Sequence, residues 1–264
     1  MEPSQDQEGT CFMSKNQMRK QAKYLKTVEK KKQNRKFEQE KQREKYKLYR
    51  QEGGLPKADL RNLQLTRLKE SLKTGLKVCV DLQFEDLMNE KELNHLTNQI
   101  KRVYSSNKAS ETPFHLHFVN FIKTGKTYNL CCDKNDGFEN YVATFEDRGV
   151  TELFNLSEVV YLSPDSENVI QSLDPSKSYI IGGLVDDSVK KNTSSLYSYQ
   201  VKISTARLPI PEYMTRSETG SYKQILTINQ VFDILLKFHE TLDWKTALSL
   251  NIPPKTGFVL KDDE

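Results

Sequence analysis

Short apolar runs alternate with segments of helical spacing from residue 77 to residue 242, and this alternation limits the fold more than any other feature. The apolar runs are rich in β-branched and aromatic residues, which is typical of buried strands. We expect strands at residues 77–82, 115–121, 157–163, 178–185, 206–210 and 225–228. We expect helices at residues 89–104, 164–173 and 229–242, another within 193–203, and a short one that starts at 243 and ends before Pro253. Strands separated by helices favour a mostly parallel sheet with helices on both faces, and therefore an α/β fold.

Residues 14–50 have the composition of a solvated arm rather than of a core. They carry 15 Lys and Arg against 4 Asp and Glu, so a basic arm precedes a mildly acidic body in a chain of net charge +4. Their apolar residues are too sparse for a coiled-coil heptad, and we expect a partly helical segment. Nucleic acid is favoured over a membrane because no bulky apolar face exists. The cations expected to contact phosphates are Lys15, Arg19, Lys20, Lys23, Lys30, Lys31, Lys32, Arg35 and Lys36.

The chain divides into an acidic tip and basic arm (1–50), a linker with a possible short helix (51–75), a folded domain (76–252) and a tail (253–264). No apolar run is long enough to span a bilayer, and no secretory signal or transit peptide is visible. The chain is therefore expected in the cytoplasm, the nucleus or both. The cysteines at 11, 79, 131 and 132 fit no zinc or redox spacing, so we expect free thiols and no structural metal. His115 and His117 are expected at exposed strand positions.

Several common catalytic motifs are absent, including the G-x-G-x-x-G and G-x-x-x-x-G-K-[ST] loops and the G-x-S-x-G elbow. What remains is a set of strand-to-loop junctions, of which Gly182-Gly183 is the most distinctive. Adjacent glycines let a backbone turn sharply or let another group approach closely. Asp186 is the only carboxylate that these junctions deliver. The stretch can be a strand, a turn and a helix cap, or it can be part of a pocket at the carboxyl ends of the strands.

Four segments in order resemble the motifs of the tRNA (guanine-9-N1)-methyltransferase family of the SPOUT superfamily. They are Tyr161–Ser163, Ile181–Asp186, Arg207–Ile210 and Leu226–Phe232. The likeness covers roughly residues 76–252, follows a basic arm as in that family, and is strongest to the vertebrate B-type branch. It implies a SPOUT methyltransferase domain at 76–252, with a trefoil knot in its C-terminal part, acting as a monomer.

The resemblance also implies a cofactor, S-adenosyl-L-methionine, and a tRNA substrate. Residues implied at the cofactor pocket are Leu162, Ser163, Gly182, Gly183, Leu208, Leu226, Thr227, Ile228 and Asn229. Asp186 matches the family's proposed catalytic aspartate, and Lys190 is implied as an RNA contact. The expected activity is methylation of N1 of guanine 9 in tRNA. The alternatives are a non-catalytic tRNA-binding protein of the same fold and a subunit of an RNA-processing complex.

Overall fold

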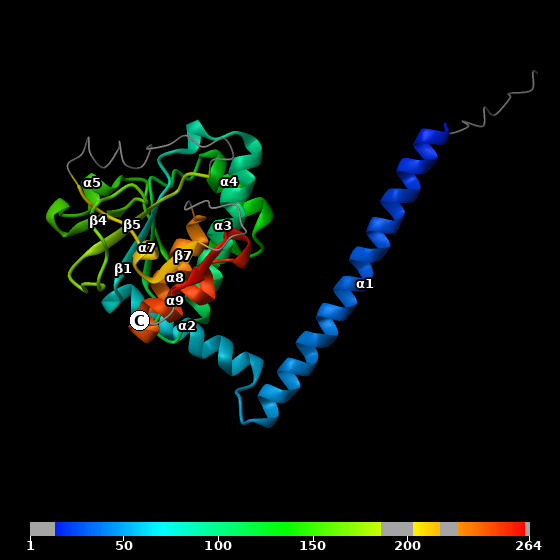
Figure 1. The fold of residues 1–264 in the computed structure, drawn as a ribbon, viewed down its shortest axis with the longest axis horizontal. Coiled ribbons are helices and arrows are strands. Elements are labelled where there is room, and N and C mark those ends of the chain that lie inside the picture. Colours follow the sequence, from blue (N-terminus) through cyan, green and yellow to red (C-terminus); the bar gives the residue numbers. More distant parts are fainter. Residues whose placement is uncertain (1–13, 186–202, 217–225, 262–264) are drawn as a thin grey trace, which may run out of the picture. The chain divides into compact units, whose positions relative to one another are not determined.

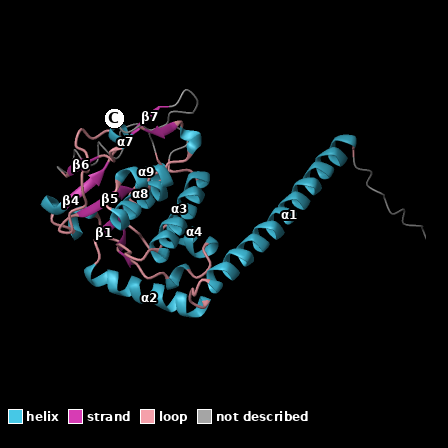
Figure 2. Cartoon of the chain, turned by 60° about the horizontal axis from the view of Figure 1, so that its bottom comes forward, coloured by secondary structure: helices cyan, strands magenta, loops and turns pink. Residues whose placement is uncertain are grey.

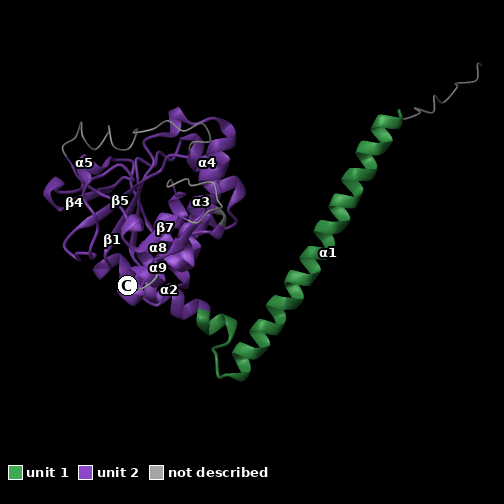
Figure 3. Ribbon diagram, in the orientation of Figure 1, with its two compact units in different colours: residues 1–60 green, residues 61–264 purple. Residues whose placement is uncertain are grey.

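The computed structural model describes residues 14–185, 203–216 and 226–261. The chain forms two compact units, Met1–Leu60 and Arg61–Glu264 (Figure 3). The first unit holds helix α1 (Lys15–Gln51) and the first turn of helix α2 (Lys57–Thr74). The expectation of a partly helical arm is corrected to one continuous helix. Ser14 caps its start in a capping box with Gln17, and no glycine or proline interrupts it.

A six-stranded sheet forms the centre of the second unit (Figure 1). Its strands are β1 (Lys77–Asp81), β2 (His115–Val119), β3 (Thr144–Phe145), β4 (Val159–Leu162), β5 (Ser178–Gly182) and β6 (Ser204–Ala206). The strand order is β3-β2-β1-β5-β4-β6, and every pairing is parallel. The predicted α/β fold with a parallel sheet is confirmed.

One face of the sheet carries the larger core. Side chains such as Val78, Phe118 and Ile181 pack there against helices. The elements that contribute to this core include α2, α3 (Glu90–Ala109), α4 (Lys126–Lys134), α8 (Ile228–Thr241) and α9 (Trp244–Asn251). Helices α8 and α9 pack side by side, and α8 also packs on α3 (Figure 2).

The opposite face of the sheet carries a smaller core. Cys79, Tyr161 and Ile180 point to this side and pack with residues of the short helix α5 (Val150–Leu153). Ile203 is buried in the same cluster, whereas residues 193–202 of the expected helix lie outside the described residues. The two cores follow the alternation of side chains along each strand, as expected for strands buried on both faces.

Three expected elements differ in the structure. Residues 164–173 form no helix because their backbone pairs with the segment after β6. Ile170 donates to the Arg207 carbonyl at 3.0 Å, and Arg207 donates to the Asn168 carbonyl at 2.8 Å. Residues 226–227 are not a strand, because a capping box at Thr227 starts helix α8. The expected strand at 206–210 lies instead at 204–206, at the edge of the sheet.

Two regions hold elements that the sequence did not indicate. Residues 124–150, where no strand or helix was expected, contain α4 and β3. After β6 the chain forms α7 (Ile210–Tyr213) and β7 (Met214–Arg216). Strand β7 pairs antiparallel with β8 (Phe258–Leu260), which lies within the expected tail. No described helix has the length and apolar character of a membrane span. The trefoil knot stays a prediction.

Candidate functional site at the carboxyl ends of the strands

The first three motif segments meet where β5, β4 and β6 end. These strands are neighbours in the sheet, and Leu162 lies opposite Ile181 on one side and Ala206 on the other. The Ser163 amide donates to the Ala206 carbonyl at 3.0 Å, which continues the pairing beyond β4. Leu162 and Leu208 are almost fully buried, and Gly182 is half-buried. The sheet therefore brings these junctions to one edge, where parallel α/β sheets commonly bind ligands.

The fourth motif segment forms the start of helix α8, which contacts β5. Leu226 is half-buried and Thr227 is exposed, whereas Ile228 and Asn229 are buried. The Thr227 hydroxyl donates to Asn229 Oδ1 at 3.1 Å, so these two polar side chains bind each other. The segment is thus a capped helix N-terminus with apolar residues on both sides of the cap.

Gln99 was not predicted, although it holds this helix start in place. Its Oε1 accepts a hydrogen bond from the Ile228 amide at 2.9 Å, across 129 residues of sequence. Gln99 is itself buried on α3. The sequence feature that could have identified Gln99 is its position three residues after Leu96, because this spacing places a polar side chain on the apolar face of the helix.

Gly183 lies against the backbone of β1. A Cβ atom at this position would lie 2.5 Å from the Asp81 carbonyl oxygen and 2.8 Å from Leu82 Cδ2. The Gly183 amide also donates to the same carbonyl at 2.7 Å. The Gly-Gly pair indicated a close approach of some group to the backbone. At Gly183 this group is the backbone at the end of β1. Packing alone accounts for glycine at this position.

Asp81 is a carboxylate at this edge that belongs to none of the four motif segments. Asp81 ends β1 directly opposite Gly182. Its Oδ1 accepts from Asn120 Nδ2 at 2.7 Å and from the Gln83 amide at 3.3 Å. Its Oδ2 accepts from Gln83 Nε2 at 2.7 Å and from the Tyr161 hydroxyl at 3.1 Å. These donors hold the carboxyl in one orientation.

Burial raises the pKa of the Asp81 carboxyl above its ordinary value, while these hydrogen bonds lower the pKa and offset part of that shift. The side chain is completely buried. The sequence showed Asp81 as the last polar residue of an apolar strand, but only the sheet register placed it beside the glycine pair.

His115 and His117 were expected to be exposed, and for His117 this was wrong. The two rings lie on one face of β2 with centroids 4.0 Å apart, and His117 packs edge-on against Phe154. Burial lowers the pKa of His117 to about 3, so the ring is neutral at physiological pH. His115 Nε2 lies 2.9 Å from the Thr144 hydroxyl. The pair belongs to the packing of the smaller core.

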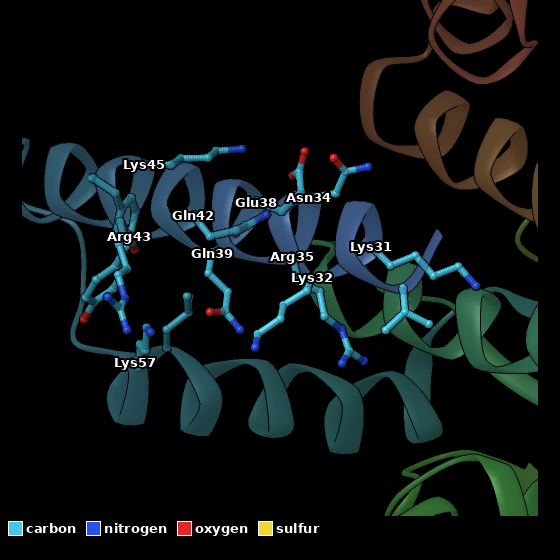
Figure 4. Close-up of a pocket in the computed structure, with 14 residues that line it drawn as sticks. Lys31, Lys32, Asn34, Arg35, Glu38, Gln39, Gln42, Arg43, Lys45 and Lys57 are labelled. Atoms are coloured by element: carbon cyan, nitrogen blue, oxygen red, sulfur yellow. The ribbon is translucent and has the colours of Figure 1, made fainter. Parts of the chain in front are cut away.

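The basic arm presents its candidate cations along α1, and all of them are exposed. Lys31, Lys32 and Arg35 line a groove between α1 and the first turn of α2 (Figure 4). Arg43, Lys45 and Lys57 line the same groove, with Glu38 as its one acidic side chain. A groove with six cations and one carboxylate attracts a polyanion.

The corner that closes this groove is well packed. The Tyr49 hydroxyl accepts from the Leu55 amide at 3.0 Å, and the Tyr49 ring fills the space where a side chain at Gly54 would lie. Arg50 donates to the Gly54 carbonyl, and Lys57 Nζ lies 4.6 Å from the centre of the Tyr46 ring. These contacts hold residues 54–57 against the end of α1.

Asp186 and Lys190, which the sequence analysis selected, lie outside the described residues. Among the described residues, Cys79, Cys131 and Cys132 are free thiols. The same residues contain no group of three or more side chains placed to ligate a metal ion.

Comparison with known proteins gives matches over most of the chain. A family model described as tRNA (guanine(9)-N(1))-methyltransferase TRM10/TRM10A matches residues 12–257. The Bos taurus protein named tRNA methyltransferase 10 homolog B is 40% identical over 257 residues, covering 96% of this chain and 81% of that protein. The tRNA (guanine(9)-N1)-methyltransferase of Schizosaccharomyces pombe is 36% identical over 207 residues, covering 75% of this chain and 64% of that protein. A crystal structure of full-length spTrm10 in complex with SAH has a TM-score of 0.60 at 36% identity, covering 67% of this chain and 94% of that chain.

Proposed function

This chain belongs to the tRNA (guanine(9)-N(1))-methyltransferase TRM10/TRM10A family, and from this premise we propose that the junctions at the strand ends bind S-adenosyl-L-methionine for methylation of guanine 9 of tRNA. The observation that supports the assignment most is the convergence of Leu162, Gly182 and Leu208 at one sheet edge. These segments are distant in sequence and carry the motifs of the family. A non-catalytic tRNA-binding protein is the alternative that the experiments below distinguish.

The described residues fit the proposed cofactor. Leu162, Leu208 and Ile228 are apolar and nearly buried, which suits the faces of an adenine ring. The amides of Ser163 and Gly183 already donate within the fold, so backbone carbonyls at the junctions after β4 and β5 are the groups that we assign to the ring edge. Asn229 adds one buried polar side chain. S-adenosyl-L-methionine supplies an electrophilic methyl group, and the protein has to align guanine N1 with it.

Asp186 is the residue that we assign to guanine N1. In the neutral base N1 carries a proton, which has to leave by the transition state, and a positioned carboxylate can accept it. An ordinary aspartate is a weak base for this step, so Asp186 either has a raised pKa or orients the base while water takes the proton. Both roles require the carboxylate, and neither requires a metal ligand.

The arm is assigned to the tRNA. Its cations are exposed on a continuous helix, and Lys31, Lys32 and Arg35 line one groove beside it. Phosphate contacts give affinity without sequence information, so we assign the choice of position 9 to the folded unit. Lys190 is proposed as a further phosphate contact. We also propose that the protein acts as a monomer in the cytoplasm or nucleus, where thiols such as Cys79 stay reduced.

The direct test is methyl transfer from labelled S-adenosyl-L-methionine to a tRNA transcript with guanine at position 9. We expect label in that transcript and none in a matched transcript with uridine 9, since only the guanine offers this N1. Mass spectrometry of nuclease digests locates the methyl group. Protein that binds both tRNA and S-adenosylhomocysteine but leaves guanine 9 unmodified would support the non-catalytic alternative.

Asp186→Asn tests the residue assignment. The variant should lose at least about a hundredfold in kcat, as expected for a proton-transfer group, with little change in cofactor affinity. Asp187→Asn is the matched control and should retain most of the activity. Equal losses of kcat and of S-adenosylhomocysteine affinity in Asp186→Asn would make it a binding or structural residue instead.

A further inference from the structure

Strand β8 binds the chain segment that joins two of the proposed cofactor motifs. We propose that residues 258–261 are a positioning element for S-adenosyl-L-methionine, because they hold α7 and β7 where Leu208 and the start of α8 both complete the pocket. The inference rests on the proposed cofactor site. It assigns a role in cofactor binding to residues that follow all four motif segments in the chain.

Strand β7 follows the third motif closely in the chain. Leu208 and Pro209 lead directly into α7 and β7, and the next described residue after β7 is Leu226. Strand β7 therefore occupies the stretch between the third and fourth motifs. Among the described strands its partner is β8, and it does not join the six-stranded sheet.

Strands β7 and β8 pair along their full length. Met214 lies opposite Leu260, and Arg216 lies opposite Phe258. The Lys261 amide extends the ladder by donating to the Tyr213 carbonyl at 3.0 Å. The Tyr213 amide in turn donates to the Pro209 carbonyl at 3.4 Å, so a chain of backbone hydrogen bonds runs from Lys261 to the residue after Leu208.

One side chain of each strand is buried in the larger core. Phe258 and Met214 are both nearly buried and belong to the larger core. Helix α9 contacts both β8 and α7. Strand β8 is thus anchored on the helix that follows α8, and the anchor reaches the third motif through α7.

An ion pair joins the third motif to α7. Arg207 binds Glu212 of α7 through two hydrogen bonds of 2.8 and 2.7 Å. This pair lowers the pKa of Glu212, and the nearby charge of Lys261 lowers it further. Lys261 therefore stabilises the carboxylate that holds Arg207, the residue immediately before Leu208.

A pair of proline variants tests the proposal. Successive N–H groups of a strand point to opposite sides, and the Lys261 amide points to β7. By this alternation the Val259 amide also points to β7, and the Leu260 amide points away. Both side chains are exposed, so neither substitution opens a cavity. Val259→Pro removes a ladder bond, whereas Leu260→Pro is the matched control that keeps it.

Calorimetric titration with S-adenosylhomocysteine is the readout. We expect Val259→Pro to bind about tenfold more weakly than the unchanged chain, which corresponds to the loss of about one hydrogen bond's net contribution, and Leu260→Pro to stay within about twofold. Fluorescence of Trp244, the one tryptophan of the chain, reports on the fold of α9 in both variants. Equal affinities in the two folded variants and the unchanged chain would overturn the inference.

If Val259→Pro does not fold, hydrogen exchange on the unchanged chain tests the positioning role of β8. Coupling between two sites is reciprocal, so a ladder that favours cofactor binding has to be stabilised by it. Saturating S-adenosylhomocysteine should slow exchange of the Val259 and Lys261 amides by about threefold or more. Unchanged exchange at both amides, with the ligand bound, would refute the positioning role alone. Failure of the unchanged chain to bind the ligand would overturn the proposed cofactor site as well.

Discussion

The side chain of Gln99 on α3 accepts a hydrogen bond from the backbone amide of Ile228, the first helical residue of α8, at 2.9 Å. The first amides of a helix have no partner within the helix, and a buried one needs another acceptor. Gln99 therefore satisfies a buried donor and fixes the helix start at the same time. It joins a helix near the beginning of the folded unit to the fourth motif.

Replacing Gln99 by leucine should destabilise the protein. Gln99→Leu leaves the buried Ile228 amide without its acceptor, and we expect the free energy of unfolding to fall by about 1–3 kcal/mol. Urea unfolding followed by Trp244 fluorescence measures the change. Gln99→Glu is the control, because it keeps an acceptor in place and an anion is favoured at a helix N-terminus. A leucine variant as stable as the glutamate variant would contradict this role.

Adding a methyl group at Gly183 should be costly for steric reasons. The new Cβ would meet the Asp81 carbonyl oxygen at 2.5 Å, and backbone atoms there cannot move freely. We expect Gly183→Ala to lose about 1–3 kcal/mol of unfolding free energy, as overpacked sites do, together with cofactor affinity. Gly137→Ala is the comparison, since Gly137 has φ +72° but only a 4.0 Å contact, to Asn140 Nδ2. Its cost should be about 1 kcal/mol, from backbone strain alone.

The neutral state of His117 predicts sensitivity to acid. Burial lowers its pKa from 6.5 to about 3, so between these values the unfolded chain binds a proton that the folded chain does not. Stability therefore falls as pH falls through this range. Relative to His117→Phe, the unchanged chain should lose about 2 kcal/mol of unfolding free energy between about pH 7 and about pH 5. Parallel urea unfolding of the two proteins gives the difference. Parallel pH profiles would show that His117 is protonated in the folded state.

The groove of the arm predicts a change in the salt dependence of tRNA binding. Replacing Lys31, Lys32 and Arg35 by glutamine in one variant removes three candidate phosphate contacts. We expect the slope of log K against log salt to become shallower by about 2 to 3. Filter binding over a series of salt concentrations measures it. The double variant Lys31→Arg and Lys32→Arg keeps the charge and should keep the slope. An unchanged slope in the glutamine variant would exclude the groove from the phosphate contacts.

Local sequence patterns predicted the elements whose pattern is long or strongly amphipathic. The apolar run of β1 and the spacing of α3 and α8 each agree with the structure. The start of α8 shows where one pattern competed with another. Its β-branched residues favoured a strand, but Thr227 and Gln230 also form a capping box, and the cap decided the local structure.

Elements that depend on distant partners could not be predicted in this way. Residues 164–173 carry a proline suited to a first helical turn, yet Ile170 pairs with the backbone of Arg207 instead. Strand β8 is three residues long, and only the presence of β7 satisfies its backbone groups. Such short segments have too little local preference to determine their own conformation.

The sequence by itself determined a parallel α/β domain, a basic arm and four ordered motifs that carry the family resemblance, because periodicity and motif order are properties of the chain alone. Only the tertiary structure decided that Asp81 lies opposite Gly182 and that Gln99 supports Ile228. It also decided that Gly183 is needed for chain packing. Each of these is a contact between residues far apart in sequence, and burial of both partners, rather than local preference, selects it.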